Sequence, residues 1–571
     1  MIGVIPKSEQ ARFVKEFFEL FKTPWELYRP DRVYDVIIAT GDRLPEVSPR
    51  LLLVYGPAEK SIDARIGVSV RRRLQCAVVN NRDALLPIYR EMAMFADHSN
   101  GVACVTAESE TAGIRTGLSG STVIRLGYDL FDEIEHLLSS GQPVENAHLP
   151  TLEIHIRMLR QWILEAGIPL IEIPPTPAGH SFLACLTHDI DFVGIRNHKF
   201  DHTMWGFVYR ATVGAVRNFV RGRLSLRRLV RNWLAVASLP FVYGGWAKDF
   251  WEPFEWYLDV ETGLPATYFL IPFKRRSGDN VPGRDASRRA TAYDVSDLPH
   301  WTTTLLKKGC ELGVHGIDSW HSVDKGREEL TRIAAVTGDS AIGTRIHWLL
   351  RDANTPAVLE RAGYAYDSTF GYNETVGYRA GTGQVFRPLG AKTLLEIPLH
   401  IQDGALFYPQ RLDLSEPEAQ GRCQILIDNA AKFGGVLTLL WHDRSHAPER
   451  CWGDLYIRLL RTLKATDCWF GTAGQVVDWF RKRREVRFEL VETEDGGACA
   501  CPCYDGEEVV PPLKIRLHRP CGEGNDSAMS SPAASDFVDI PWNGVSRDEI
   551  GQLLQESFVG PSDPVRAELA S

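Results

Sequence analysis

The chain has 571 residues, of which 44% are hydrophobic and 24% are charged, the composition of a soluble globular protein with two or three domains. Its net charge of −9 gives no general reason to expect a nucleic-acid partner, and none is predicted. The N-terminus lacks the basic start and apolar core of a signal peptide, and no run of about 18 apolar residues marks a membrane-spanning helix.

Most of the eleven cysteines occur singly in apolar segments such as FLACL and GVACVTA. This pattern is typical of reduced, buried thiols. Together with the missing signal peptide, it predicts a cytoplasmic location.

Residues 1–178 are predicted to form an α/β accessory domain. Its strand-like runs and its clearest helix are YDVIIAT, RLLLVYG, CAVVNN, GVACVTA and the helical LGYDLFDEIEHLLSS. No phosphate-binding loop or dinucleotide fingerprint occurs there. The segment IEIPPTPAGH is the expected linker out of this domain.

Between residues 179 and 482, short apolar strands alternate with helices. The candidate strands are SFLACLT, ATYFLI, ELGVH, AIGTRIH, YAYDST, LLEIPLHI, GVLTLLWH and CWF. Such alternation predicts a parallel sheet that is covered by helices. Seven or eight units in about 300 residues favour a (β/α) barrel over an open sheet.

The last segment, residues 483–571, is predicted to be a small β-rich appendage. Two β-like pieces, VRFELVE and LKIRLHR, are followed by the Gly/Ser/Asp-rich stretch CGEGNDSAMSSPAAS. Such a composition is typical of a flexible tail.

Polar residues follow several of the predicted barrel strands at the point where each strand ends. THDID supplies Asp189 and Asp191, ELGVHG supplies His315, AIGTRIHW supplies Arg345, and GVLTLLWH supplies His442. In a parallel barrel the carboxyl ends of the strands meet at one rim, where active sites form. One polar strand end is ordinary, but several that are rich in His, Asp and Arg predict a shared site.

These residue types favour metal-assisted hydrolysis. Two imidazoles and one carboxylate suit a divalent cation such as zinc and leave a coordination position for water. The metal lowers the pKa of that water, a second carboxylate can accept its proton, and a histidine can protonate a leaving amine. No G-x-S-x-G motif accompanies these residues, which disfavours a serine hydrolase.

Residues 180 to about 470 resemble a divergent branch of the polysaccharide deacetylase family, the carbohydrate esterases of family four. THDID is similar to the family's T-F-D-D-G motif and HGIDSWH to its H-[ST]-x-x-H motif. GTRIHW resembles the segment with the orienting arginine, and LTLLWH resembles the strand that ends in L-x-H. The resemblance implies a distorted (β/α) barrel that removes acyl groups from sugars with the help of a divalent metal.

The resemblance also implies a ligand set. Asp191, His315 and His321 are the implied metal ligands, with zinc as the expected ion. Histidines six apart, unlike a pair four apart, do not share one helical face, so a loop must fold back to bring them together. His347 is the alternative ligand if the loop does not.

The same resemblance implies three catalytic residues. Asp189 corresponds to the catalytic base, Arg345 to the arginine that orients this base, and His442 to the general acid. An exchange of roles between Asp189 and Asp191 stays open.

The expected substrate is an N-acetylated amino sugar in nucleotide-linked, lipid-linked or oligomeric form. Two alternatives remain. One is a metal-dependent amidohydrolase that acts on a non-sugar C–N bond, and the other is a catalytically inactive barrel that binds carbohydrate. Release of acetate from an amino sugar separates the first from a deacetylase, and metal-dependent turnover excludes the second.

An unusual stretch, residues 202–248, has no acidic residue but seven arginines interleaved with apolar residues. A basic amphipathic helix can lie on an anionic membrane surface. Two interpretations follow: a peripheral contact with the inner face of a membrane, or a helical insertion that covers the barrel.

Overall fold

The structure is a computed structural model that describes residues 1–81, 84–96, 101–283, 286–492, 498–520 and 537–542. Contacts divide the chain into two compact units. The N-terminal unit comprises Met1–Gln142, Pro150–Ala178 and Trp479–Ser571, and the barrel unit comprises Pro143–Leu149 and Gly179–Asp478. The segment after residue 478 is thus grouped with the N-terminal unit.

A nine-stranded mixed sheet forms the centre of the N-terminal unit, in the order β2-β1-β3-β4-β9-β8-β6-β5-β7. Its strands are β1 (Ile2–Ile5), β2 (Trp25–Leu27), β3 (Val36–Ala39), β4 (Leu51–Tyr55), β5 (Val70–Asn81), β6 (Ala84–Phe95), β7 (Gly101–Ala107), β8 (Glu110–Leu118) and β9 (Ser121–Leu126). The first four strands and β9 pair in parallel, and β5 to β8 add antiparallel pairings. Strands β3 and β4 are buried along their whole length, which explains their continuous apolar sequence.

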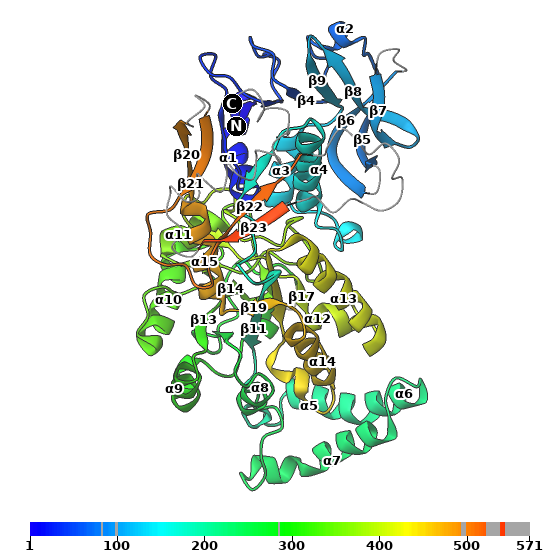
Figure 1. Ribbon diagram of the computed structural model, residues 1–571. Coiled ribbons are helices and arrows are strands. Elements are labelled where there is room, and N and C mark those ends of the chain that lie inside the picture. The colour runs from blue at the N-terminus through cyan, green and yellow to red at the C-terminus, as the bar shows by residue number, and fades with distance from the viewer. Residues whose placement is uncertain (82–83, 97–100, 284–285, 493–497, 521–536, 543–571) are drawn as a thin grey trace, which may run out of the picture. The chain divides into compact units, whose positions relative to one another are not determined.

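Four helices complete the first part of this unit (Figure 1). They are α1 (Ala11–Leu20), α2 (Asp63–Ile66), α3 (Leu130–Ser139) and α4 (Thr151–Glu165). The side chain of Asp129 caps α3 by accepting hydrogen bonds from the first-turn N–H groups of Phe131 and Asp132, which explains why the predicted helix starts there.

The C-terminal strands belong to the same unit. These strands are β20 (Arg487–Glu492), β21 (Ala498–Cys503), β22 (Lys514–His518) and β23 (Phe537–Pro541). An earlier strand, β10 (Leu170–Glu172), pairs with one of them. β22 pairs antiparallel with both β10 and β23, and β20 pairs antiparallel with β21. The structure confirms the expected β-rich C-terminal region; the expected flexible tail lies outside the described residues.

The barrel unit is built on a parallel sheet in the order β16-β15-β14-β13-β12-β11-β18-β17, with β19 also paired to β11. Its strands are β11 (Phe182–Ile190), β12 (Ala266–Leu270), β13 (Glu311–Gly316), β14 (Thr344–Ile346), β15 (Tyr366–Asp367), β16 (Leu395–Glu396), β17 (Ile401–Gln402), β18 (Val436–Leu440) and β19 (Cys468–Phe470). These strands pair in parallel with one another. The sheet is an open half-barrel, which confirms the expected α/β fold of the barrel type.

Helices connect these strands and lie around the sheet in Figure 1. They are α8 (Phe254–Val260), α9 (Pro299–Lys307), α10 (Val323–Thr337), α11 (Thr355–Ala362), α12 (Asp403–Phe407), α13 (Glu416–Phe433), α14 (Gly453–Lys464) and α15 (Ala473–Glu485), the last of which continues into the N-terminal unit. α11 ends at Gly363, whose φ of 101° is a left-handed conformation that suits glycine. One apolar cluster under these helices includes the buried side chains of β11, β12 and β18.

The basic stretch forms a helical insertion between β11 and β12. It comprises α5 (His202–Tyr209), a π-helical turn (Arg210–Gly214), α6 (Ala215–Val220) and α7 (Leu226–Tyr243). Figure 1 shows α6 and α7 side by side, projecting from the rest of the barrel unit. Within the described residues, no helix has both the length and the apolar character that crossing a bilayer requires.

Candidate metal centre and active site

In β11, the first strand of the barrel, neighbouring side chains point to opposite faces, so His188 and Asp189 lie in different surroundings. His188 is fully buried; its Nδ1 lies 2.9 Å from the carbonyl oxygen of Trp441 and its Nε2 lies 2.9 Å from Glu261 Oε1. Asp189, on the opposite face of the strand, instead accepts a hydrogen bond from Arg345. His188 is therefore a packing residue, and the carboxylates that follow it belong to the site.

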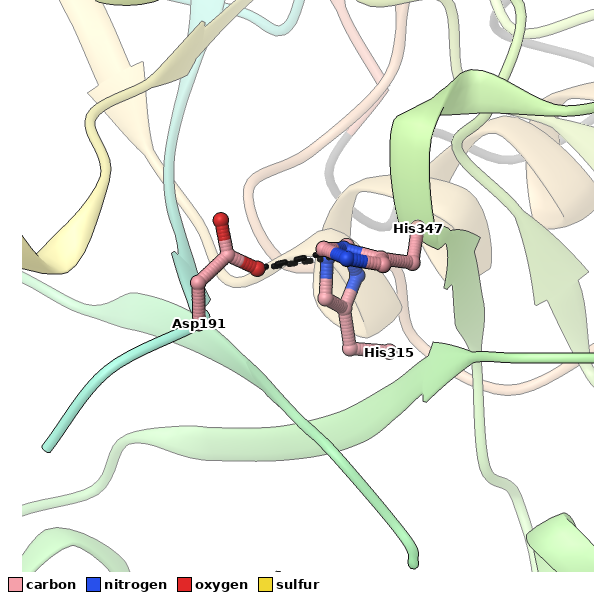
Figure 2. A group of neighbouring side chains, drawn as sticks. All are labelled: Asp191, His315 and His347. Carbon is pink, nitrogen blue, oxygen red and sulfur yellow. Dashed lines mark hydrogen bonds and ion pairs between the residues drawn. The ribbon is translucent and has the colours of Figure 1, made fainter. Parts of the chain in front are cut away.

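Three side chains from separate elements converge at the carboxyl ends of the strands. Asp191 follows β11, His315 lies in β13, and His347 follows β14. Asp191 Oδ1 is 3.3 Å from His315 Nε2 and 3.1 Å from His347 Nδ1, and the two nitrogens are 2.8 Å apart. Figure 2 shows the carboxylate and the two imidazole rings pointing toward one another. These residues form a group that could hold a metal ion.

The geometry and chemistry of this group fit a divalent cation. Ligand atoms about 2.0–2.1 Å from a tetrahedral ion lie roughly 3.3 Å apart, close to the separations given above. The buried Oδ1 of Asp191 has no hydrogen-bond partner, which is an unfavourable state for a carboxylate oxygen unless a cation neutralises it. His315 Nδ1 lies 2.9 Å from the carbonyl oxygen of Arg345; a carbonyl only accepts, so Nδ1 carries the proton and Nε2 keeps its lone pair.

The electrostatics of the group also suit ligation. Burial lowers the pKa of His347 to about 4, although the charge of Asp191 opposes that shift. Burial would raise the pKa of Asp191, but His347 and His315 hold that pKa well below its usual range. At neutral pH the group therefore offers a carboxylate and neutral imidazole, the forms that bind metals.

A buried arginine fixes the backbone around both histidines. Arg289 is 1% exposed, and its Nε and Nη2 donate to the carbonyl oxygen of His347 at 3.2 and 2.9 Å. Its Nη2 also donates to the carbonyl oxygen of Gly316, next to His315, at 3.2 Å. One guanidinium thus ties together the two segments that present the imidazoles.

His321 lies apart from this group. The chain turns after β13, and His321 Nε2 is 3.2 Å from Asp318 Oδ1, an oxygen that also accepts from the backbone N–H of Asp279 at 2.7 Å. The structure therefore brings together Asp191 and His315, as the sequence predicts, and brings His347, the alternative ligand, to the place expected for His321.

Asp189 and Arg345 form a buried pair beside the metal group. Arg345 Nη1 donates to Asp189 Oδ1 at 3.1 Å and to Thr187 Oγ1 at 2.7 Å. Its Nε and Nη2 donate to the carbonyl oxygen and Oγ of Ser368 at 2.9 and 2.7 Å. Asp189 Oδ2 is 3.9 Å from His315 Nε2. This fork holds the carboxylate of Asp189 in one orientation next to the ligands.

His442 is held by a carboxylate that sequence reasoning missed. Its Nδ1 lies 2.5 Å from Asp403 Oδ1, and its backbone N–H donates to Asp403 Oδ2 at 2.8 Å. Burial alone would lower the pKa of His442, but the charge and hydrogen bond of Asp403 raise it to about 10. Asp403 directly follows β17, so the rule that found the other residues, a polar side chain at a strand end, applies to it as well.

One open pocket lies over this group, with an empty volume of about 750 Å³ that includes open solvent. Asp189, Asp191, His315, His347 and His442 all contribute to its wall.

The loop after His347 carries backbone strain at the edge of the pocket. The two residues that follow it, Trp348 and Leu349, have φ values of 67° and 53°, a left-handed conformation that costs about 1–3 kcal/mol per residue. Both line the pocket, and the indole of Trp348 is 38% exposed. A partly exposed aromatic ring beside a polar site is suited to stacking on a sugar face.

No protein-family model matches the chain, and no curated protein matches it. Among solved structures, the chain is similar to a polysaccharide deacetylase from Mycobacterium smegmatis, with 18% identity and a TM-score of 0.33 over 56% of this chain and 99% of that one. It is also similar to the Puue allantoinase, with 14% identity and a TM-score of 0.32 over 53% of this chain and 91% of the other.

A third similar structure is that of Agd3, described as a carbohydrate deacetylase. It has 10% identity and a TM-score of 0.36, and the match covers 95% of this chain and 98% of that one. Carbohydrate deacetylases, the proteins that the sequence motifs resemble, are thus among the solved structures to which this chain is similar.

Proposed function

We propose that the protein is a metal-dependent hydrolase that removes an N-acetyl or related acyl group from an amino sugar. The observation that carries this proposal is the convergence of Asp191, His315 and His347 in a pocket that also contains Asp189 and His442. The two nitrogen donors and one oxygen donor favour zinc among the common divalent cations. The ligand set proposed here has His347 in place of His321.

In the proposed mechanism each residue has one task. A divalent cation at this group supplies Lewis acidity, which lowers the pKa of water and polarises a carbonyl group. Asp189 accepts the proton of the attacking water, since Arg345 donates to its carboxylate and fixes its orientation. His442, protonated through its contact with Asp403, donates a proton to the departing amine.

The metal set is tested by ion analysis of purified variants. His347→Ala is expected to lose most of a stoichiometric divalent ion, because it removes one of three protein ligands. His321→Ala is the matched control, since its ring contacts Asp318 outside the group; it is expected to retain the ion. The opposite pattern would restore the sequence-predicted set with His321.

The reaction is tested with N-acetylated sugar nucleotides and oligosaccharides. The metal-loaded protein is expected to release acetate from at least one of them, and removal of the metal by a chelator is expected to stop that release. Turnover of a non-sugar amide alone would identify an amidohydrolase of another class. Metal binding without any turnover would identify a binding barrel.

The insertion 202–248 supports a peripheral membrane contact. Exposed apolar residues lie along both of its arms: Trp205, Tyr209, Val213, Val216 and Val220 in the first, at spacings of three to four, and Leu226, Val230, Trp233 and Leu234 in the second. We call these residues the apolar stripe. The positions that pack inward on α7 are different ones, such as Leu229, Asn232 and Ala235, so the stripe faces outward.

The charge of the insertion indicates what covers this stripe. Its arginines stand in a segment that has no acidic residue, within a chain of net charge −9. Arg223 and Arg228 form ion pairs with acidic residues of the barrel unit, whereas Arg217, Arg221 and Arg227 are exposed. Apolar residues flanked by arginines fit an anionic lipid surface, as found on the inner face of the cytoplasmic membrane. A lipid-linked glycan would then meet the pocket at that surface.

Sedimentation with lipid vesicles tests this contact. The protein is expected to bind anionic vesicles, more weakly at high salt, since each arginine near such a surface contributes on the order of 1 kcal/mol. Replacing Trp233 and Leu234 with serine is expected to abolish binding, while Leu306→Ser, an exposed leucine on α9, is the matched control. Absence of binding combined with dimer formation would show that a second copy covers the stripe.

A further inference from the structure

The pocket wall near His442 carries a concentration of positive charge that the proposed reaction does not use. Three of the pocket-lining residues are arginines: Arg411, Arg444 and Arg450. Arg444 lies two residues after His442 in the chain, within the short 3-10 helix η8 (Asp443–His446). Two of these arginines are held in place by aromatic rings.

Arg444 is stacked between rings and has no acidic partner. Its guanidinium carbon lies 3.6 Å from the ring centre of Phe192 and 4.9 Å from that of Trp251. Among the described residues, no carboxylate forms an ion pair with it and no group accepts a hydrogen bond from its side chain. Stacking occupies the faces of a guanidinium and leaves the N–H groups along its edge available to a ligand.

Arg450 likewise contacts two aromatic rings, those of Trp452 and Tyr408. Its guanidinium carbon lies 4.4 Å from the ring centre of Trp452 and 4.9 Å from that of Tyr408. Its buried Nε has no hydrogen-bond partner. The neighbouring Glu449 does not form an ion pair with it; one carboxylate oxygen of Glu449 accepts from Trp251 Nε1 at 3.4 Å.

Neighbouring groups respond to the positive charge of these arginines. The pKa of Arg444 is lowered by burial and then by the charge of Arg450. Burial would raise the pKa of Tyr408, but Arg450 and Arg444 lower that pKa below its usual value. Arg444 and Arg450 are half-buried, and Glu449 and Asp403 add negative charge near Arg450 without forming an ion pair with it. The N–H groups of both arginines are thus suited to a ligand that brings negative charge.

We propose that Arg444 and Arg450 bind a negatively charged group, a carboxylate or a phosphate, on the sugar whose amine is released. This inference rests on the proposed deacetylase function. The charge belongs on the sugar rather than on the acyl group because Arg444 adjoins His442, the residue that protonates the leaving amine. The substrate class is therefore an acidic or phosphorylated N-acyl amino sugar.

Calorimetric binding to metal-loaded protein tests the proposal. An Asp189→Asn background prevents turnover during the titration. The three probes are N-acetylglucosamine, its 6-phosphate and the corresponding uronic acid, which differ only in the group at carbon 6, neutral in the first and negatively charged in the other two. We expect at least one charged probe to bind about tenfold or more tightly than the neutral sugar, the size of one charge-assisted hydrogen bond. Which charged probe is preferred distinguishes phosphate from carboxylate.

Variants then assign the preference to the two arginines. Arg444→Gln and Arg450→Gln are each expected to remove most of the preference for the charged probe. Arg458→Gln is the matched control, because Arg458 lies on α14 outside the pocket and its replacement removes the same single positive charge. This variant is expected to keep the preference. Circular dichroism verifies that each variant is folded, and the two arginines give independent readings if one variant is not.

The outcomes separate this inference from the proposed function. Equal affinity for charged and neutral sugars in the wild type, or a preference that survives in both glutamine variants, would overturn the anion site. If the wild type also releases acetate from neutral sugar, the deacetylase proposal stands without it. If no sugar is hydrolysed but the arginine-dependent preference is measured, the deacetylase proposal fails and the anion site remains.

Discussion

Replacing Asp403 with asparagine tests the assignment of His442 as the acid. Asp403 is fully buried, and its carboxylate contacts both Nδ1 and the backbone N–H of His442, as described above. Burial would lower the pKa of His442, but Asp403 raises that pKa to about 10. Asparagine keeps the size and one acceptor oxygen of aspartate, so the substitution removes mainly the charge.

The expected shift follows from the sign of this interaction. A carboxylate in contact with an imidazole raises its pKa by about 1–3 units, so its removal lowers the pKa of His442 by that amount. A general acid acts only while it is protonated, and activity is lost as the pH rises through its pKa. The alkaline limb of kcat/KM is therefore expected to lie about 1–3 pH units lower in Asp403→Asn, while the acidic limb stays in place.

Acetate release from an N-acetyl amino sugar, measured from acidic to alkaline pH, gives both limbs. Ser445→Ala is the matched control, because Ser445 also donates to Asp403 but carries no charge; its alkaline limb is expected to stay close to that of the wild type. An alkaline limb that does not move in Asp403→Asn would show that the titration of His442 does not control the reaction.

Three further substitutions test other parts of the site. Asp189→Asn is expected to keep the metal and to lose about 10²-fold or more in kcat, the usual scale for a general base; unchanged turnover would assign the base elsewhere. Arg289→Met is expected to weaken metal affinity about 10–100-fold in a chelator competition, the scale of an outer-shell contact. The control Arg288→Met changes an exposed arginine and is expected to keep the affinity. Equal affinities in the two variants would show that Arg289 does not position the histidine segments. Arg345→Lys is expected to lower stability by about 1–3 kcal/mol in urea unfolding, because an ammonium lacks the fork that reaches both Asp189 and Ser368; a wild-type midpoint would contradict this.

The barrel strands were predictable because each is a short apolar run bounded by turn residues. β11, β12 and β18 are buried at every position, so their sequences carry an unbroken signal. The antiparallel strands β6 and β8 were not identified, since their pairing depends on partners that periodicity does not name. The pairing of β22 with β10 is likewise a long-range contact, which the local sequence does not specify.

The site residues that follow a strand were predictable, because the carboxyl ends of parallel strands meet at one rim of a barrel. Asp189, Asp191, His315, Arg345 and His442 were identified in this way. In the structure the four acidic and histidine residues line one pocket, and the buried Arg345 contacts Asp189 behind the pocket wall. The choice between His321 and His347 was not decided by sequence, because it depends on which way a loop turns after β13. Asp403 was missed because the two-residue strand before it merges with the preceding apolar run.

The pairing of β10 with β22 has a consequence for synthesis on the ribosome. β10 ends at Glu172 and β22 begins about 340 residues later at Lys514. Residues Gly179–Asp478 of the barrel unit emerge between them. At a synthesis rate of about 5–20 residues per second, roughly 17–70 s pass between the synthesis of β10 and that of β22. During that time an unpaired strand edge is a site for wrong association. The nascent chain therefore keeps this strand edge unpaired while the barrel is synthesised. Chaperones, or wrong association with other chains, can act on the edge until β22 is made.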